Sequence, residues 1–363
     1  MLHPSRQTHE EVHACITWVD PLSRGRAQAL IEAPPSSFGV SGILRYMYED
    51  LLDQWDLPRP RELVRTAFGM SNESYLVDSA AGAHVLRVYV AKPLQGIRFE
   101  HEVLRRLVEA DLPFRVPQPL PTKRGDTIAL EVDTARHCAL FPRIPGETLD
   151  DGDTAAVARA AEAFARLDIA LAGIEHTDVA APVFAGDLRA MHPAVTDLAD
   201  LDEVISRQGR QLVERSAERA GPIYASLPTQ LIHGDFSFGN VLVRSGRVRG
   251  IVDFEYSGRD VRAMELAAGL SSVILRDRGE VLWRPVLRGY LGTERLDLTE
   301  LAALPELAIL HWAVIVVWWA GRSLEGRPFP DGLGALVDRA LVVERWMDTR
   351  GPELVAEALR AST

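Results

Sequence analysis

Hydrophobic and polar positions alternate in short runs over part of the first half of the chain. ELVRTAFG, ESYLVDS and HVLRVYV follow one another between residues 62 and 90, separated by glycine or small polar residues. Such runs predict β-strands, and the short connections predict an antiparallel meander. Further strands are predicted around Val116–Leu120 and Thr127–Val132, before the apolar run CALFPRIPG, whose prolines break a strand. We therefore expect a small β-rich lobe.

The spacing of apolar residues changes to a helical period elsewhere. A weak helix around Arg26–Ala33 and an amphipathic one near Ile43–Trp55 precede the strands, and a helix at about Phe99–Ala110 lies among them. Thr154–Leu171, much of Leu198–Leu227 and the last third of the chain are also predicted to be helical. The fold expected is α+β and bilobal. We divide it into an N-terminal helical extension (1–60), a β-sheet lobe with one main helix (61–141) and a larger helical lobe (142–363).

Composition and charge narrow the function. The 363 residues carry a formal net charge of −11, which argues against a nucleic-acid binder because such proteins need a basic face. Cys15 and Cys138 match no ligand or redox spacing, so we expect no disulfide and, with a polar N-terminus, a cytoplasmic protein. The apolar run Leu307–Ala320 is short for a membrane span and is predicted to be a buried helix. A monomer and a homodimer both remain open.

The segment from His233 to Asp253 carries the chemistry. It reads HGDFSFGNVLVRSGRVRGIVD, with Asn240 five residues after Asp235 and a second aspartate, Asp253, after an apolar run. Phosphoryl transfer from ATP needs a group that orients the acceptor hydroxyl and ligands for the metal at the phosphates, and kinase loops supply these at this spacing. VLV and GIV predict a hairpin that brings Asn240 and Asp253 to its open end, where both oxygens can bind Mg²⁺.

The same segment closely resembles the signature of the aminoglycoside phosphotransferase and choline kinase superfamily, the small-molecule relatives of protein kinases. This resemblance implies a protein-kinase-like fold, Asp235 as catalytic base, Asn240 and Asp253 as Mg²⁺ ligands, and His233 as a scaffold residue. It also implies ATP or GTP as the phosphate donor. The continuation EYSGRDVRAMELAAGL is similar to the family's segment after the metal aspartate, except that Glu265 stands where an aspartate is usual. We expect Glu265 to be structural.

The resemblance extends upstream to the nucleotide site. AFGMSNESYLV would cover the phosphates, with Gly69 allowing close backbone approach and Ser71, Asn72 or Ser74 as donors. Arg87 occupies the position of the kinase lysine that grips the α- and β-phosphates and keeps its positive charge.

Two further parts of the nucleotide site are expected from the resemblance. The carboxylate partner of Arg87 is expected on the next helix, with Glu100 preferred over Glu102. For adenine we expect the carbonyl of Pro142 and the N–H of Ile144, with Phe141 behind them.

The acceptor site has no motif, so its residues are inferred from charge and aromatic content. Residues 147–203 contain thirteen acidic and three basic side chains, which favours a cationic acceptor if they face the cleft. In the Trp-rich stretch from His311 to Trp319, helical spacing places Trp312, Ile315, Val316 and Trp319 on one core-facing side. Candidate acceptor residues are Glu255, Asp260, His311 and Trp318.

Three functions remain open. The first, which we prefer, is an ATP-dependent kinase for a hydroxyl of a basic small molecule, of the aminoglycoside or antibiotic-resistance type. The second is a metabolic kinase of the homoserine, choline or ethanolamine, or methylthioribose type, which the spacing cannot separate from the first. The third is a nucleotide-binding pseudokinase that acts as an interaction module, against which the intact Asp235, Asn240 and Asp253 argue. No nucleic acid or membrane partner is expected.

Overall fold

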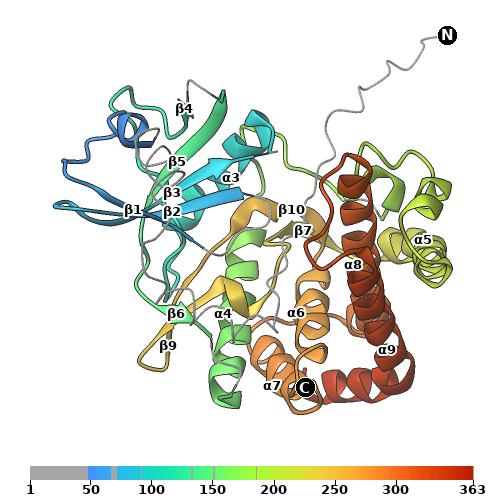
Figure 1. Cartoon of the computed structure of the whole chain (residues 1–363). Coiled ribbons are helices and arrows are strands. Elements are labelled where there is room, and N and C mark those ends of the chain that lie inside the picture. Colours follow the sequence, from blue (N-terminus) through green and yellow to red (C-terminus); the bar gives the residue numbers. More distant parts are fainter. Residues whose placement is uncertain are drawn as a thin grey trace, which may run out of the picture.

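A computed structural model describes residues 48–66, 72–90, 92–131, 134–149, 152–184 and 186–362. Its strands and helices separate into two lobes, a β-rich one at the upper left of Figure 1 and a helical one at the lower right. The expected bilobal α+β fold is therefore confirmed. The helix predicted around Arg26–Ala33 and the first part of the one near Ile43–Trp55 lie outside the described residues.

The small lobe is built on a five-stranded antiparallel sheet in the order β1-β2-β3-β5-β4. The first three strands form the predicted meander. The strand predicted at Val116–Leu120 is wrong, because Pro117 and Pro119 remove backbone donors that a ladder needs. A backbone hydrogen bond ties this stretch to the sheet, from the N–H of Leu120 to the carbonyl of Leu140 (2.8 Å). The strands are β1 (Glu62–Arg65), β2 (Asn72–Ser79), β3 (Gly82–Tyr89), β4 (Ala129–Glu131) and β5 (Arg136–Pro142).

The residues just before β1 pack onto this sheet. Residues 48–52 are helical, and Leu52 and Trp55 are buried in one apolar cluster with Leu86 and Leu140 of the sheet. The Trp55 indole N–H also donates to the carbonyl of Leu120 (3.1 Å). The end of the segment that we assigned to an N-terminal extension is thus part of the sheet's own core.

One long helix, α3 (Leu94–Val108), accompanies the sheet and also reaches the second lobe. Ile97 and Phe99 share a buried cluster with Phe141 of β5. The carboxylate of Glu102 accepts the backbone N–H groups of Asp178 (2.9 Å) and Val179 (3.1 Å). Through these hydrogen bonds of Glu102, α3 connects the sheet lobe to a loop of the helical lobe.

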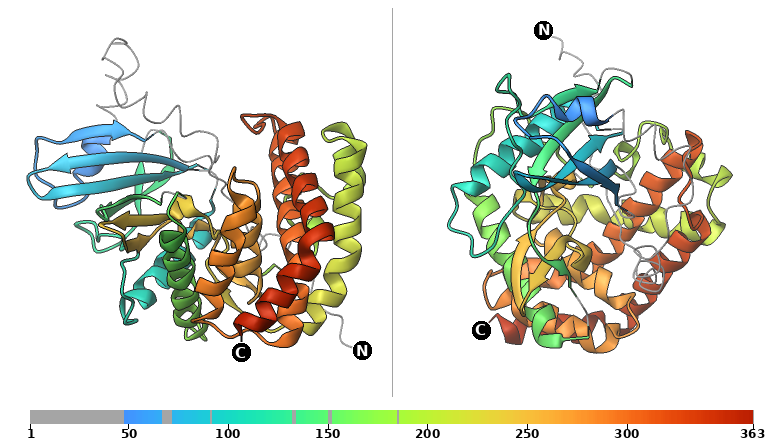
Figure 2. Two further views of the ribbon diagram at one scale, coloured as in Figure 1. Left: turned by 90° about the horizontal axis from the view of Figure 1, so that it is seen from below. Right: turned by 60° about the vertical axis from the view of Figure 1, so that its left-hand side comes forward.

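The large lobe contains long helices that pack around a central one. The helix α8 contacts α5, α6 and α9, while α4 packs against α7. Figure 2 shows these helices side by side on the far side of the molecule from the sheet. Their bounds are α4 (Thr154–Ala172), α5 (Arg207–Ser226), α6 (Met264–Ile274), α7 (Gly279–Leu291), α8 (Leu298–Leu324) and α9 (Leu333–Ala361).

Helix α8 is the only described helix that is long and apolar enough to cross a membrane, yet 78% of its most apolar window is buried inside the protein. Trp312 and Trp319 are in the core as expected. Trp318 and His311, which helical spacing placed on another side, are buried as well, at 6% and 9% exposure. Neighbouring elements cover α8 on all sides, so the core-facing part of the helix is wider than the single side that we expected.

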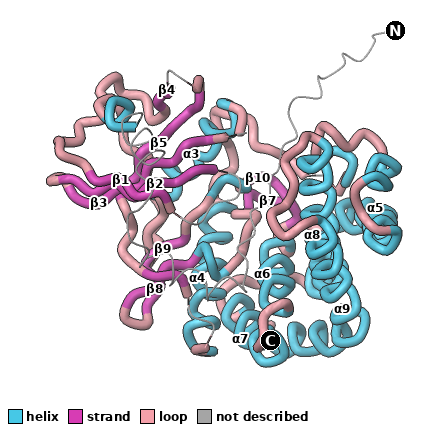
Figure 3. The backbone as a smooth tube through the Cα atoms, viewed as in Figure 1, coloured by secondary structure: helices cyan, strands magenta, loops and turns pink. Residues whose placement is uncertain are grey.

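Two small sheets lie between the lobes and carry the connecting loops (Figure 3). One is the antiparallel pair β7 (Thr229–Ile232) and β10 (Gly258–Val261). The other consists of β6 (Glu147–Thr148), β8 (Val241–Arg244) and β9 (Arg247–Ile251). The segment from His233 to Asp253 runs from the end of the first sheet through the second.

Candidate active site

The catalytic loop begins where β7 ends, at His233-Gly234-Asp235. Gly234 has a φ of 82°, and a Cβ at this position would lie 2.6 Å from the carbonyl oxygen of Tyr256. Only glycine meets both conditions without strain. The close approach of two backbone segments therefore explains the glycine of the HGD sequence.

His233 is fully buried and holds the loop together. Its Nε2–H donates to the carbonyl of Val252 (3.1 Å), and its Nδ1 accepts the N–H of Asp235 (3.3 Å). Its ring also packs edge-on against Phe164 and Phe254. Burial lowers the pKa of His233 to about 4, so the imidazole is neutral at pH 7. This geometry matches a scaffold rather than a proton carrier.

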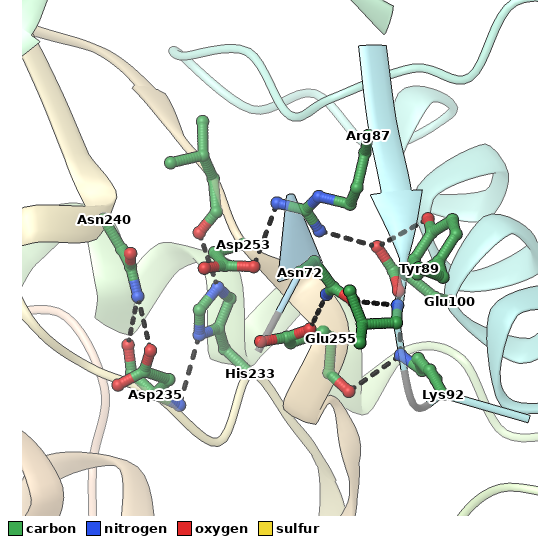
Figure 4. Close-up of polar contacts among 12 residues, drawn as sticks. Asn72, Arg87, Tyr89, Lys92, Glu100, His233, Asp235, Asn240, Asp253 and Glu255 are labelled. Carbon is green, nitrogen blue, oxygen red and sulfur yellow. Dashed lines mark hydrogen bonds and ion pairs between the residues drawn. The ribbon is translucent and has the colours of Figure 1, made fainter. Parts of the chain in front are cut away.

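Asp235 and Asn240 are joined directly. The Asn240 Nδ2 donates to Oδ2 of Asp235 (2.7 Å) and to its backbone carbonyl (3.0 Å). Both side chains are buried, and Figure 4 shows the amide nitrogen turned toward the carboxylate. The amide oxygen of Asn240 is at the other end of the group, where it can serve as a metal ligand.

The predicted hairpin is present as β8 and β9. Its turn has Ser245 and Gly246 at φ 53° and 71°, the left-handed conformations that a tight two-residue turn requires. At the open end, the N–H of Val252 donates to the carbonyl of Asn240 (2.9 Å). Asp253 follows in a left-handed conformation (φ 71°, ψ 64°). The hairpin thus brings Asn240 and Asp253 to the same end.

Arg87 connects the sheet lobe to this end of the hairpin. Its guanidinium lies 3.2 Å from Oε1 of Glu100 and 3.0 Å from Oδ1 of Asp253 (Figure 4). Glu100, not Glu102, is therefore the carboxylate beside Arg87. Burial would raise the pKa of Glu100, but the charges of Lys92 and Arg87 outweigh it and hold the pKa below its usual value.

Lys92 is a residue of the site that sequence patterns do not predict. Its Nζ lies 2.7 Å from Oε2 of Glu100 and donates to the carbonyl of Glu255 (2.7 Å). Glu100 thus has a cation at each oxygen. Lys92 lies between β3 and α3 and belongs to no recognisable spacing, so only the three-dimensional structure reveals it.

The phosphate-covering turn is described only at its end. Gly69 and Ser71 lie outside the described residues. The Asn72 side chain donates to the Glu255 carboxylate, and its amide oxygen accepts the N–H of Val90 (3.3 Å). Asn72, which we expected to bind phosphate, therefore uses part of its hydrogen-bonding capacity in a contact between the lobes.

The expected adenine residues lie where β5 leaves the sheet. Pro142 pairs with His84 in the β3–β5 register, and Phe141 is buried edge-on against His101. Pro142 and Ile144 line a cavity of about 340 Å³ beside the end of α3. Phe141 is in the core behind them.

A second cavity lies next to the catalytic loop, and it separates the four residues that we expected at the acceptor. Asp260 and His311 line it, together with Gly234. Glu255 and Trp318 are not among its lining residues. Glu255 faces Asn72 of the sheet lobe, and Trp318 packs edge-on against His192. The complete lining is Pro182, Phe184, Met191, Ile232, Gly234, Tyr256, Gly258, Arg259, Asp260, Met264, His311 and Val314.

The acidic segment 147–203 does not form this cavity. None of its described acidic side chains lines the wall. Asp153, Asp187 and Asp197 instead cap the first turns of helical segments, and Asp168 is buried against the hydroxyl of Tyr290. Helix capping thus accounts for part of the excess of acidic residues from which we expected a cationic acceptor.

Comparison with known proteins decides the family. The pattern of the phosphotransferase enzyme family matches residues 62–304, which include the sheet lobe, the catalytic loop and the hairpin. The chain belongs to this family. It is an ATP-dependent small-molecule kinase, and the expected protein-kinase-like fold is confirmed.

Individual members of the phosphotransferase family are distant in sequence. A homoserine kinase of Phenylobacterium zucineum is 26% identical over 272 residues, covering 71% of this chain and 79% of its own. An aminopropanol kinase associated with a microcompartment superposes with a TM-score of 0.65 at 19% identity, over 87% of this chain and 99% of its own. Amicoumacin kinase, solved with AMP-PNP and Ca²⁺, gives 0.64 at 15% identity, over 85% and 94%.

The residues present fit a divalent metal of the kind that this family uses with its nucleotide. No cluster of three or more His, Cys, Asp or Glu side chains in the described ranges could hold a metal alone. Mg²⁺ needs no such cluster, because it takes one or two protein oxygens and completes its shell with phosphate and water. Asn240 Oδ1 and the carboxylate of Asp253 are hard oxygen donors of this type.

Proposed function

We propose that the chain is a metabolic kinase of the homoserine type, which transfers the γ-phosphoryl group of ATP to the hydroxyl of a short amino acid or amino alcohol. The observation that carries this proposal is the lining of the cavity beside Gly234, which places one carboxylate, Asp260, in a mostly apolar wall. Such a wall suits an acceptor with a single ammonium group better than an aminoglycoside, whose several ammonium groups would each need a partner when buried. The homoserine kinases among the relatives support the same choice over an antibiotic.

In this reaction Asp235 would accept the proton of the acceptor hydroxyl. The Asn240 amide fixes one oxygen of the Asp235 carboxylate, and His233 fixes its backbone. A positioned general base of this kind contributes on the order of 10² to 10⁴-fold to the rate. The fixed orientation of the Asp235 carboxylate is therefore what its role as base depends on.

Asn240 and Asp253 would hold Mg²⁺, which supplies neutralisation of the charge on the transferred phosphate. Arg87 brings a fixed positive charge to the same place, because Glu100 and Asp253 hold its two ends. Lys92 secures the other oxygen of Glu100. These contacts support an active kinase rather than a pseudokinase.

The test is ADP release with a panel of acceptors: L-homoserine, 3-aminopropanol, choline and an aminoglycoside. We expect kcat/KM to be at least tenfold higher for one of the two short primary amines than for choline or the aminoglycoside. Asp235→Asn should lose on the order of 10² to 10⁴-fold in kcat while still binding ATP. Preference for the aminoglycoside would overturn the proposal, and full turnover by Asp235→Asn would overturn the role of this residue.

A further inference from the structure

The small cavity extends from the catalytic loop along β10. Gly258 pairs with Ile232, the residue just before His233, and Asp260 lies two positions further along the same strand. Side chains two positions apart share one face, at a spacing of about 7 Å. Gly234 and Asp260 both line the cavity. One end of the cavity is therefore beside Asp235, and Asp260 marks another point along its wall.

Asp260 is a carboxylate without a cation. The hydroxyl of Tyr224 (2.5 Å) and the N–H of Val261 (2.6 Å) both donate to Oδ1, and both donors are neutral. No described residue donates to Oδ2. Burial raises the pKa of Asp260 to about 7, as expected for a carboxyl group with no compensating charge. The side chain still keeps part of its surface exposed.

Arg259, the neighbour of Asp260, does not supply the missing positive charge. Arg259 also lines the cavity, but its guanidinium donates to the carbonyl of Glu175 (2.7 Å). A positively charged ligand group would complete the site.

Helix α8 adds a neutral polar group to the wall. His311 is nine-tenths buried, and no described residue forms a hydrogen bond with it. Burial lowers its pKa to about 4, so it does not repel a cation at pH 7. Phe184, Met191 and Val314 make the remaining wall apolar, which strengthens any ion pair formed inside.

We propose that this cavity is the acceptor site and that Asp260 binds the primary ammonium group of the acceptor, with His311 as a second polar contact. The inference rests on the proposed kinase function and deepens it. In a three-carbon amino alcohol or in homoserine, the hydroxyl oxygen and the nitrogen are about 5 Å apart when extended. An ammonium group at Asp260 would thus direct the hydroxyl toward Gly234 and Asp235. A quaternary ammonium lacks N–H donors and is bulkier, so it should bind poorly.

The decisive experiment compares two acceptors that differ only in the amine. For the wild type, kcat/KM for L-homoserine should exceed that for 4-hydroxybutyrate by at least 30-fold. In Asp260→Asn, which keeps the shape and an oxygen for Tyr224, this ratio should fall below about fivefold, mainly through KM for homoserine, with KM for ATP unchanged. Asp202→Asn, an exposed acidic residue of the helical lobe, is the matched control and should keep the wild-type ratio.

A second measurement needs no variant and no turnover. Calorimetry at pH 6 in buffers of different ionisation enthalpy should show that the wild type releases about one proton on binding homoserine, because the ammonium group ionises Asp260. Binding of 4-hydroxybutyrate should release none. No proton release together with an unchanged ratio in Asp260→Asn would overturn this inference but leave the kinase function standing. Absence of turnover with every short amine would instead overturn the proposed function.

Discussion

The catalytic loop and the proposed acceptor cavity lie side by side but are built differently. From His233 to Asp253 the functional groups are close in sequence, and backbone contacts such as Val252 N–H to Asn240 C=O fix them. The cavity draws its wall from separate regions: Pro182 to Met191, the end of β7, β10 with its flanks, and α8. Chemistry is thus encoded locally, whereas the choice of acceptor is encoded by the packing of the helical lobe.

This difference explains why family members can share one reaction while their names record several acceptors. Replacing Asp235, Asn240 or Asp253 of the local segment should lower turnover with every acceptor alike. Replacing a residue of the cavity should change the ranking of acceptors and leave the nucleotide side intact. The following variants test that separation, beginning with the largest effect.

Asp253→Ala should cause the largest loss. Removing the carboxylate takes away an oxygen that we assign to Mg²⁺ and the partner of Arg87. Loss of metal stabilisation is worth several kcal/mol, on the order of 10³-fold in kcat. The loss should be equal for every acceptor. Arg247→Ala, at the exposed first residue of β9 in the same hairpin, is the control and should retain wild-type kcat. Activity within tenfold of wild type in Asp253→Ala would contradict the metal assignment.

Gly234→Ala tests the close approach to Tyr256. The added Cβ would lie 2.6 Å from a backbone oxygen at a φ of 82°, so the loop must move. We expect about 10²-fold lower kcat, since misplacement of catalytic groups by about 1 Å has this effect. Gly125→Ala is a matched control with φ 88° and no atom within 4 Å of the new Cβ. It should lose about 1 kcal/mol of unfolding free energy and no activity. Equal kinetic effects in the two variants would refute the argument.

The sequence predicted the reaction better than the surroundings of the site. The spacing of Asp235, Asn240 and Asp253 survives in the fold because a hairpin is a local structure, and the strands of the sheet were readable from their alternation. Lys92 could not be found, since its contacts with Glu100 and Glu255 come from separate parts of the chain.

Helix α8 shows a second limit of prediction from the sequence, because a helix that is buried all round has no periodic pattern of polar residues. Helix α8 is apolar all round, so no pattern could tell that His311 faces a cavity while Trp318 packs on His192. Pro117 and Pro119, by contrast, are visible in the sequence and are sufficient to exclude a strand at Val116–Leu120.

Glu100 and Glu102 are neighbours on α3 with different tasks, which makes them a matched pair. Glu100→Gln should raise KM for ATP and lower kcat/KM by about 10- to 100-fold, because Arg87 and Lys92 lose a buried charged partner. Glu102→Gln should instead lower the unfolding free energy by about 1 to 2 kcal/mol, since Glu102 holds backbone N–H groups at Asp178 and Val179. Kinetics and urea unfolding separate the two. This division of roles would be refuted if Glu100→Gln lowered only stability and Glu102→Gln lowered only kcat/KM.

The smallest expected effect is a pH dependence of stability from the cavity wall. The pKa of His311 is about 4 in the folded chain, against about 6.5 when unfolded. The unfolded state therefore binds more protons between these values, and stability is lost as pH falls from 6.5 toward 4. Between pH 6.5 and 5 this amounts to about 1 to 2 kcal/mol. Asp260, which lines the same cavity from β10 beside Arg259, has a pKa of about 7 and remains protonated below pH 6.

His311→Gln should remove this loss without adding a charge. The difference in unfolding free energy between wild type and His311→Gln, measured by urea titration at several pH values, should shift against the wild type as pH falls. Because the other titrating groups are common to both proteins, they cancel in the difference. A difference that stays constant from pH 6.5 to 5 would mean that His311 titrates normally in the fold. The cavity would then admit water and charge more readily than its apolar wall implies, and the ion pair proposed at Asp260 would be weaker.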